Sequence, residues 1–150
     1  MKKLIIILII MIFILIPDSG ADSSPASNVR PLEITSLIIR FDKTDAIFIL
    51  NYDLNRLAKL YVLLLGSSSL EPKIRAIFSS FDYEILKIDQ NKAILKVRNV
   101  SRYDRGYYFH DSKELGTTIS RIIVYTPDSF KPIEFNLNLN STPDVFYYAK

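Results

Sequence analysis

The chain of 150 residues is long enough for one ordinary domain, and its 19 basic and 16 acidic residues leave a net charge of +3. It contains no Cys, which excludes disulfides, thiolate metal sites and a cysteine nucleophile. A single His excludes the two-histidine zinc motifs, and four Gly are too few for a glycine-rich phosphate loop. The composition therefore predicts no metal site and no cofactor, and so small a positive charge predicts no nucleic acid partner.

The N-terminus has the pattern of a signal peptide. Met1–Lys3 is short and cationic, and Leu4–Ile16 is an unbroken run of 13 apolar residues. Pro17 ends the run, and Ser19–Ala21 supplies small residues for cleavage after Ala21. At about 1.5 Å per residue the run spans roughly 20 Å, less than the roughly 30 Å hydrocarbon core, so we expect cleavage. The alternative is an uncleaved anchor, with membrane contact through residues 4–16 only.

This pattern divides the chain into three parts. Residues 1–21 are the predicted signal peptide, and residues 22–31 are a flexible leader, since they are rich in Ser, Asp and Pro with almost nothing apolar. Residues 32–150 form a single predicted β-rich domain. Export without disulfides suits a microbial cell envelope, so we expect the protein in the envelope or outside the cell.

The first predicted elements of the domain form a β-hairpin. Residues 33–41 are rich in Ile and Leu with Thr and Ser between them, which predicts a strand. Residues 42–45 form a compact polar turn, and residues 46–50 are a continuous apolar run. This run predicts a second strand that is buried on both faces.

Two helices are predicted after the hairpin. Leu54, Leu57, Tyr61 and Leu64 recur at helical spacing, and Gly66 is a natural end for a helix over residues 54–65. The run from Leu60 to Leu65 leaves a buried strand as the alternative. A shorter helix is predicted over residues 70–78, with three apolar side chains facing the core: Ile74, Ile77 and Phe78.

From Tyr83 onward the apolar pattern changes to a period of two, which is typical of strands. Further strands are predicted at residues 83–88, 93–98, 107–110, 119–125, 133–140 and 146–148. Short turns between consecutive strands imply antiparallel pairing. The sequence thus predicts an α+β fold, a mostly antiparallel sheet of about seven strands with two helices inserted after the first hairpin.

A local motif offers an alternative fold. The spacing L-x-V-x-N-V-S-x-x-D-x-G-x-Y is carried by Leu95, Val97, Asn99, Val100, Ser101, Asp104, Gly106 and Tyr108. It resembles the stretch between strands E and F of immunoglobulin-like domains, including the tyrosine corner. The resemblance implies an all-β sandwich in which the Tyr108 hydroxyl bonds to upstream backbone. The chain departs from the family because His110 stands where the next Cys is expected and because Trp is absent.

Residues 98–116 hold the densest group of polar side chains. Arg and Tyr contribute most per residue at interfaces, and Arg pairs with carboxylate, sulfate or phosphate. The candidate binding residues are Arg98, Arg102, Tyr103, Arg105, Tyr107 and His110. An exported domain that binds an anionic polymer, a glycan or another envelope protein is therefore the first functional hypothesis.

Two other functions are consistent with the sequence. The only histidine, His110, could act as the general base of an exported hydrolase, oriented by Asp111 or Glu114. The aromatic C-terminus over residues 146–148 could instead dock as a strand, which would make the protein a structural subunit of a surface assembly.

Overall fold

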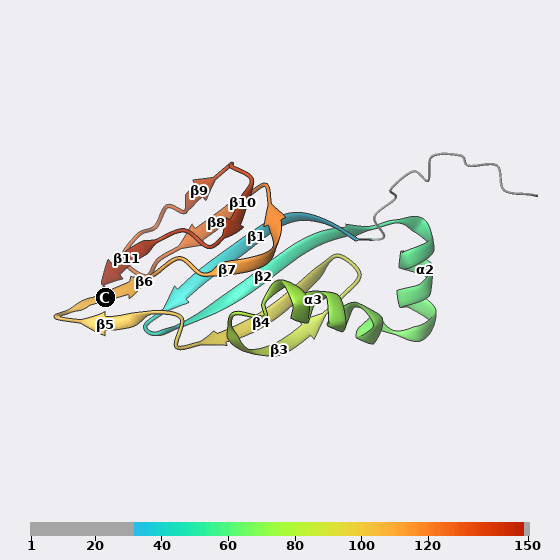
Figure 1. Ribbon diagram of the computed structural model, residues 1–150, viewed down its shortest axis with the longest axis horizontal. Helices are drawn as coiled ribbons and strands as arrows, with labels where there is room; N and C mark the ends of the chain where they lie inside the picture. Colours follow the sequence, from blue (N-terminus) through green and yellow to red (C-terminus); the bar gives the residue numbers. More distant parts are fainter. Residues whose placement is uncertain (1–31, 149–150) are drawn as a thin grey trace, which may run out of the picture.

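The computed structural model describes residues 32–148 and shows an α+β fold, mostly strand with two short α-helices (Figure 1). The predicted signal peptide (1–21) and leader (22–31) lie outside the described residues. The elements in chain order are β1 (Leu32–Asp42), β2 (Asp45–Leu54), α2 (Arg56–Leu65), a 3₁₀ turn η1 (Ser67–Leu70), α3 (Glu71–Ile77), β3 (Asp82–Ile88), β4 (Lys92–Arg98), β5 (Arg102–Asp104), β6 (Tyr107–His110), β7 (Glu114–Ile119), β8 (Ile122–Tyr125), β9 (Ile133–Phe135), β10 (Leu139–Ser141) and β11 (Val145–Tyr148). The described part of the chain thus has more strands than the seven predicted.

These strands form three sheets. The largest has the order β3-β4-β2-β1-β8-β9, β10 pairs with β7, and the third has the order β11-β6-β5. β1 and β8 are parallel, whereas the other pairs are antiparallel. The expectation of mostly antiparallel pairing therefore holds, and β1 with β8 is the exception. A short turn fixes the direction only of strands that follow each other in sequence, and these two do not.

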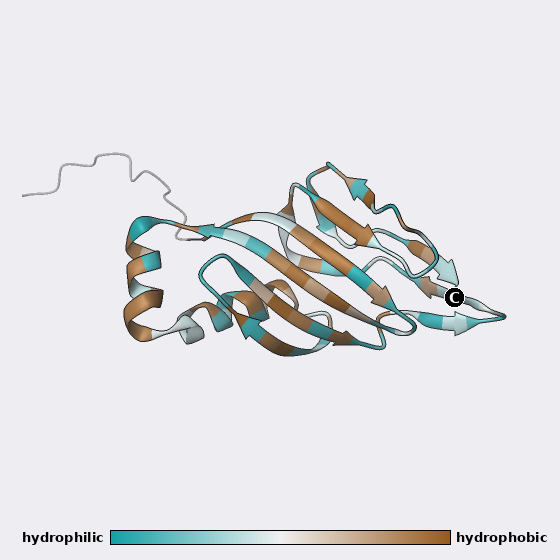
Figure 2. Cartoon of the chain, turned by 180° about the vertical axis from the view of Figure 1, so that it is seen from behind, coloured by the Kyte–Doolittle hydropathy of each residue, from teal (hydrophilic) through white to brown (hydrophobic). Residues whose placement is uncertain are grey.

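The predicted first hairpin is confirmed, with β1 and β2 paired from Leu32 opposite Leu54 to Asp42 opposite Asp45. The prediction that the second strand is buried on both faces is wrong. Phe48 and Leu50 are fully buried on one face of β2, while the side chains between them are only half-buried on the other face. Figure 2 shows this second face of the six-stranded sheet without a helix in front of it.

The prediction of a helix after this hairpin is confirmed by α2. The Asn55 side chain caps the start of α2 by accepting a hydrogen bond of 2.8 Å from the Ala58 N–H. Gly66, with a φ of 86°, ends the helix and donates its N–H to the Val62 carbonyl. A positive φ favours Gly, which explains why the helix ends there.

The apolar residues that recur at helical spacing in α2 do not face the core. Leu57 and Leu64 are 78% and 72% exposed, and Tyr61 is also exposed. Val62 is the buried residue of the helix. The stripe of apolar side chains exists as expected, but it points to solvent because α2 extends beyond the end of the sheet (Figure 1).

The second helix, α3, faces the core as predicted, with Ile74, Ile77 and Phe78 buried. The Phe78 ring packs against Phe48 of β2 at a centroid distance of 5.8 Å. β7 crosses close to this helix at Gly116, where a Cβ atom would overlap the backbone oxygen of Ala76. The helix and β7 therefore lie on the buried face of the large sheet.

The predicted strand over residues 133–140 is two strands. β9 pairs with β8 in the large sheet, whereas β10 pairs with β7. Leu137 lies between them and is exposed. The alternation of apolar and polar residues continues through the bend, so the pattern gives no sign that the strand changes partner. The predicted strand 119–125 is likewise divided, between the end of β7 and β8.

The immunoglobulin-like alternative is wrong as an all-β sandwich, because residues 32–148 contain two α-helices and a parallel strand pair. The hydroxyl that reaches back to upstream residues belongs to Tyr147. It donates to the Lys43 carbonyl at 2.6 Å and accepts from the Ser101 hydroxyl at 2.8 Å. Tyr108 stacks on the Tyr147 ring, with a centroid distance of 5.6 Å and an interplanar angle of 17°.

Candidate functional site

The three-stranded sheet presents a row of aromatic side chains to solvent. Its pairing places Arg102 opposite Phe109 and Phe109 opposite Phe146. It also places Asp104 opposite Tyr107 and Tyr107 opposite Tyr148. Since paired residues and alternate residues of a strand share a face, all of these side chains lie on one side of the sheet. We call this side the aromatic face, formed by Arg102, Asp104, Tyr107, Phe109, Phe146 and Tyr148.

The aromatic face is open to solvent. Phe146 is 72% exposed, and Tyr107 and Tyr148 are about half exposed, at 46% and 52%. The Tyr107 ring lies edge-on to Tyr148, with 6.0 Å between centroids and an angle of 87°, and is tilted by 50° to Phe109. The rings therefore form a ridged apolar surface rather than a flat one.

Arg102 supplies the positive charge of the aromatic face. Its guanidinium lies 5.5 Å from the centroid of the Phe109 ring and forms an ion pair of 3.1 Å with Asp111. A guanidinium over a ring is held by the quadrupole of the ring. Both side chains of the ion pair are largely exposed, so the pair orients Arg102 but contributes little to folding stability.

The opposite side of the same sheet attaches it to the core. Tyr103, Tyr108 and Tyr147 lie side by side across the three strands, with Tyr103 61% exposed and Tyr147 fully buried. The Tyr147 ring packs on Phe41 of β1 at a centroid distance of 4.9 Å. Burial raises the pKa of the Tyr147 hydroxyl to about 12. The aromatic face is therefore supported from behind by a tyrosine held at both its ring and its hydroxyl.

His110 is buried, with 1% of its surface exposed, and both ring nitrogens have partners. Nδ1 donates to the Val100 carbonyl at 2.7 Å, and Nε2 lies 2.8 Å from Thr142 Oγ1. Since a carbonyl can only accept, the neutral ring carries its proton on Nδ1, and Nε2 accepts from the threonine hydroxyl. Burial lowers the pKa of His110, which favours this neutral form.

The structure does not join His110 to the two carboxylates proposed to orient it. Asp111 follows β6 and pairs with Arg102, while Glu114 starts β7 and is exposed. The neighbours of the ring are instead Thr142 and the ring of Phe41, at a centroid distance of 5.1 Å. This geometry leaves no nitrogen of the imidazole facing solvent or a substrate.

The other predicted binding residues are dispersed. Arg102 and Tyr107 lie together on the aromatic face, whereas Tyr103 belongs to the opposite side of the sheet. Arg105 stands in the turn between β5 and β6 with a φ of 48°. Arg98 ends β4 in the large sheet, where it forms an ion pair with a glutamate of β3. The charge-rich segment 98–116 is thus not one patch.

Phe109, Phe146 and Tyr148 were not among the predicted binding residues. The segment 146–148 was considered as a docking strand, but in the structure it is paired with β6 of its own chain. The signal for the aromatic face was the spacing of two between aromatic residues, at Tyr107 and Phe109 and again at Phe146 and Tyr148.

Within residues 32–148, no group of three His, Asp or Glu side chains is arranged to hold a metal ion. None of the helices in this part of the chain has the length and apolar character needed to cross a membrane. No known family model, curated protein or solved structure matches the chain.

Proposed function

We propose that this protein is an exported domain of the cell envelope or extracellular space that acts by binding, and that its aromatic face binds another protein of the envelope. The observation that carries the proposal is the exposure of Phe146, Tyr148 and Tyr107 on one sheet face, which also carries Arg102 on its edge strand β5. Aromatic residues and Arg are enriched at the centres of protein interfaces, where they contribute most of the binding energy.

The arrangement of the rings favours a protein over a glycan. A sugar stacks its flat face on the flat face of an aromatic ring, so a polysaccharide on a sheet needs rings that lie in one plane. Here the Tyr107 ring is tilted by 50° to Phe109 and by 87° to Tyr148. Ridges of this kind fit the side chains of a partner protein.

The alternative of an exported hydrolase receives no support from the geometry. A histidine that acts as a general base needs a free ring nitrogen within hydrogen-bond reach of the proton that it removes. In His110 both nitrogens are already bonded inside the protein, to Val100 and Thr142. The proposal of export rests on the signal-peptide pattern of residues 1–21. Mass spectrometry of the secreted protein tests it, and the expected result is a mature chain that begins at Asp22.

Site-specific photo-crosslinking tests the partner. A photoreactive residue in place of Phe146 of the full chain, expressed in its own host cell, should give a discrete adduct with a second protein. The matched control replaces Leu86, which is also exposed but lies on β3 of the large sheet. Arg102→Ala should reduce the Phe146 adduct about tenfold, as expected for an interface hot spot.

Three outcomes contradict the proposal. Equal adducts from both positions show non-specific contact, and an adduct only with a second copy of this chain shows self-assembly. In the third, the protein sediments with purified cell-wall polysaccharide and the Phe146→Ser variant does not. That result would show that the aromatic face binds a glycan.

A further inference from the structure

The helix α2 has an apolar side that faces solvent. Its exposed apolar residues are Leu57, Leu60, Tyr61, Leu63, Leu64 and Leu65. All of these except Leu63 lie along one side of the helix, and we call those five residues the apolar stripe. At 100° per residue the apolar stripe covers an arc of about 140°. Val62 and Ala58 lie outside this arc and are the more buried residues of the helix, so the helix contacts the fold through its other side.

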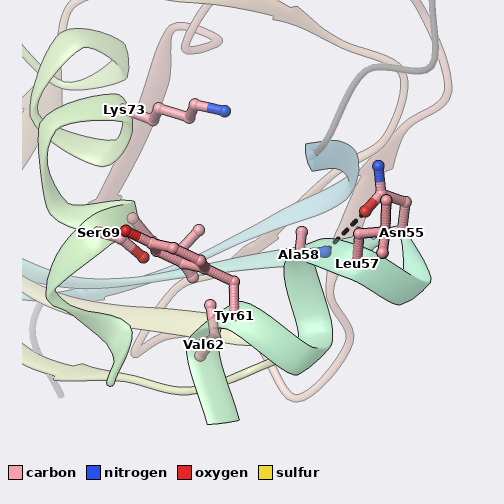
Figure 3. Close-up of a pocket in the computed structure, with 8 residues that line it drawn as sticks. Asn55, Leu57, Ala58, Tyr61, Val62, Ser69 and Lys73 are labelled. Atoms are coloured by element: carbon pink, nitrogen blue, oxygen red, sulfur yellow. Dashed lines mark hydrogen bonds between the residues drawn. The ribbon is translucent and has the colours of Figure 1, made fainter. Parts of the chain in front are cut away.

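Positive charge flanks the apolar stripe. Arg56 and Lys59 are exposed on α2, and the helix contains no acidic residue. Between α2 and the segment that follows it lies an open hollow of about 380 Å³, lined mainly by apolar atoms of Leu57, Tyr61 and Leu70. Figure 3 shows the Tyr61 side chain in this hollow and Lys73 of α3 at its edge. An apolar surface bordered by three cations complements an anionic amphiphile.

The N-terminal part of the chain joins the fold at the same place. Leu32 pairs with Leu54, which directly precedes Asn55, the cap of α2. The apolar run Leu4–Ile16 is therefore connected through residues 17–31 to the end of the molecule that carries the helix. In extended form this connection reaches at most about 50 Å.

We infer that α2 lies along the surface of an anionic lipid bilayer. The apolar stripe enters the boundary of the acyl chains, and Arg56, Lys59 and Lys73 lie at the level of the lipid phosphates. If residues 4–16 are retained, they and α2 enter the same leaflet, so that two segments of one chain hold it at the membrane. If residues 4–16 are removed, α2 supplies the contact that remains.

The charges argue against a second copy of the chain as the occupant. In a two-fold dimer through the apolar stripe, each partner would bring the same Arg56 and Lys59 to the interface. Like charges at an interface are unfavourable, whereas the phosphates of an anionic bilayer neutralise them.

Because the chain has no Cys, a single fluorophore can report on α2 directly. The full chain with Leu64→Cys, labelled with an environment-sensitive dye, is mixed with vesicles of phosphatidylglycerol and phosphatidylcholine. The control carries the dye at Leu86→Cys on β3, an exposed position outside α2. We expect the emission at position 64 to rise several-fold and shift to the blue, with no change at position 86.

Charge reversal tests whether the basic residues beside the apolar stripe contribute to membrane binding. In the Leu64→Cys protein, the pair Arg56→Glu and Lys59→Glu should weaken insertion of α2 about tenfold or more, since each basic residue near the surface contributes about 1 kcal/mol. The pair Lys96→Glu and Lys131→Glu makes the same change in net charge elsewhere and should leave the emission unchanged.

Two results would overturn the inference. In the first, the dye at position 64 keeps its aqueous emission while the protein sediments with the vesicles, which shows that another segment holds the membrane. In the second, the emission rises with protein concentration in the absence of vesicles, which shows that the apolar stripe binds a second copy.

Discussion

Two buried tyrosines, Tyr52 and Tyr147, make the fold sensitive to alkaline pH. The Tyr52 hydroxyl bonds to the carbonyl of Asp89 in the turn between β3 and β4, and the Tyr147 hydroxyl bonds to the carbonyl of Lys43. Burial raises the pKa of each from 10.0 to about 12. The folded chain therefore disfavours ionisation of either hydroxyl.

The raised pKa values determine how the free energy of unfolding changes with pH. Below pH 10.0 both tyrosines are neutral in the folded and the unfolded chain, and their full contribution to stability is present. Between pH 10.0 and about 12 only the unfolded chain loses these protons, so stability falls as the pH rises. Each tyrosine lowers the free energy of unfolding by about 1.4 kcal/mol per pH unit, or about 2.7 kcal/mol over the interval. Together they remove about 5 kcal/mol, which is the whole stability of many domains of this size.

Urea denaturation at stepped pH, followed by far-ultraviolet circular dichroism, measures this loss. Tyr147→Phe should halve the tyrosine part of the slope and also cost about 1–3 kcal/mol at neutral pH, because the Lys43 carbonyl and the Ser101 hydroxyl lose a partner. All other side chains are the same in both proteins, so the difference between the two curves isolates Tyr147. Parallel curves for the parent and the variant would refute the assignment.

Two other substitutions test the packing and the buried histidine. Gly116→Ala should destabilise the protein by about 1–3 kcal/mol or prevent folding, because the new Cβ meets the Ala76 carbonyl, and thermal unfolding would measure the change. The lowered pKa of His110 predicts that stability falls as the pH drops below 6.5, by at most about 1.4 kcal/mol per pH unit. His110→Gln, the chain having no other His, should flatten that part of the profile. An unchanged profile in the variant would contradict the assignment to His110.

The helices were predictable because their signals are local. Gly66 marks the end of α2 in the sequence as in the structure, and the spacing of Ile74, Ile77 and Phe78 correctly gives the buried side of α3. In α2 the same kind of pattern marks a side that the fold leaves in solvent. An apolar stripe shows which side of a helix avoids water, but it does not show whether the rest of the chain reaches that side.

The sheet partners and the site were less predictable because they depend on distant residues. Nothing in the alternation of residues 133–140 distinguishes the half that pairs with β8 from the half that pairs with β7. The surroundings of His110 come from Val100 and from Thr142, which lies 32 positions away. A lone His next to carboxylates in sequence therefore left a general base open as an alternative, whereas the fold makes it a buried hydrogen-bonded link.

The two proposed surfaces lie at opposite ends of the molecule, with β1 running between them (Figure 1). Leu32 of β1 lies beside the start of α2, and Lys43, just past its other end, bonds to Tyr147 behind the aromatic face. The 11 residues of β1, at about 3.3 Å each, separate the two ends by roughly 35 Å. A bilayer under α2 would therefore leave the aromatic face clear of the lipid surface and open to a partner. Because the two surfaces share no side chain, Phe146→Ser should leave the α2 fluorescence signal intact, so either proposal can fail while the other holds.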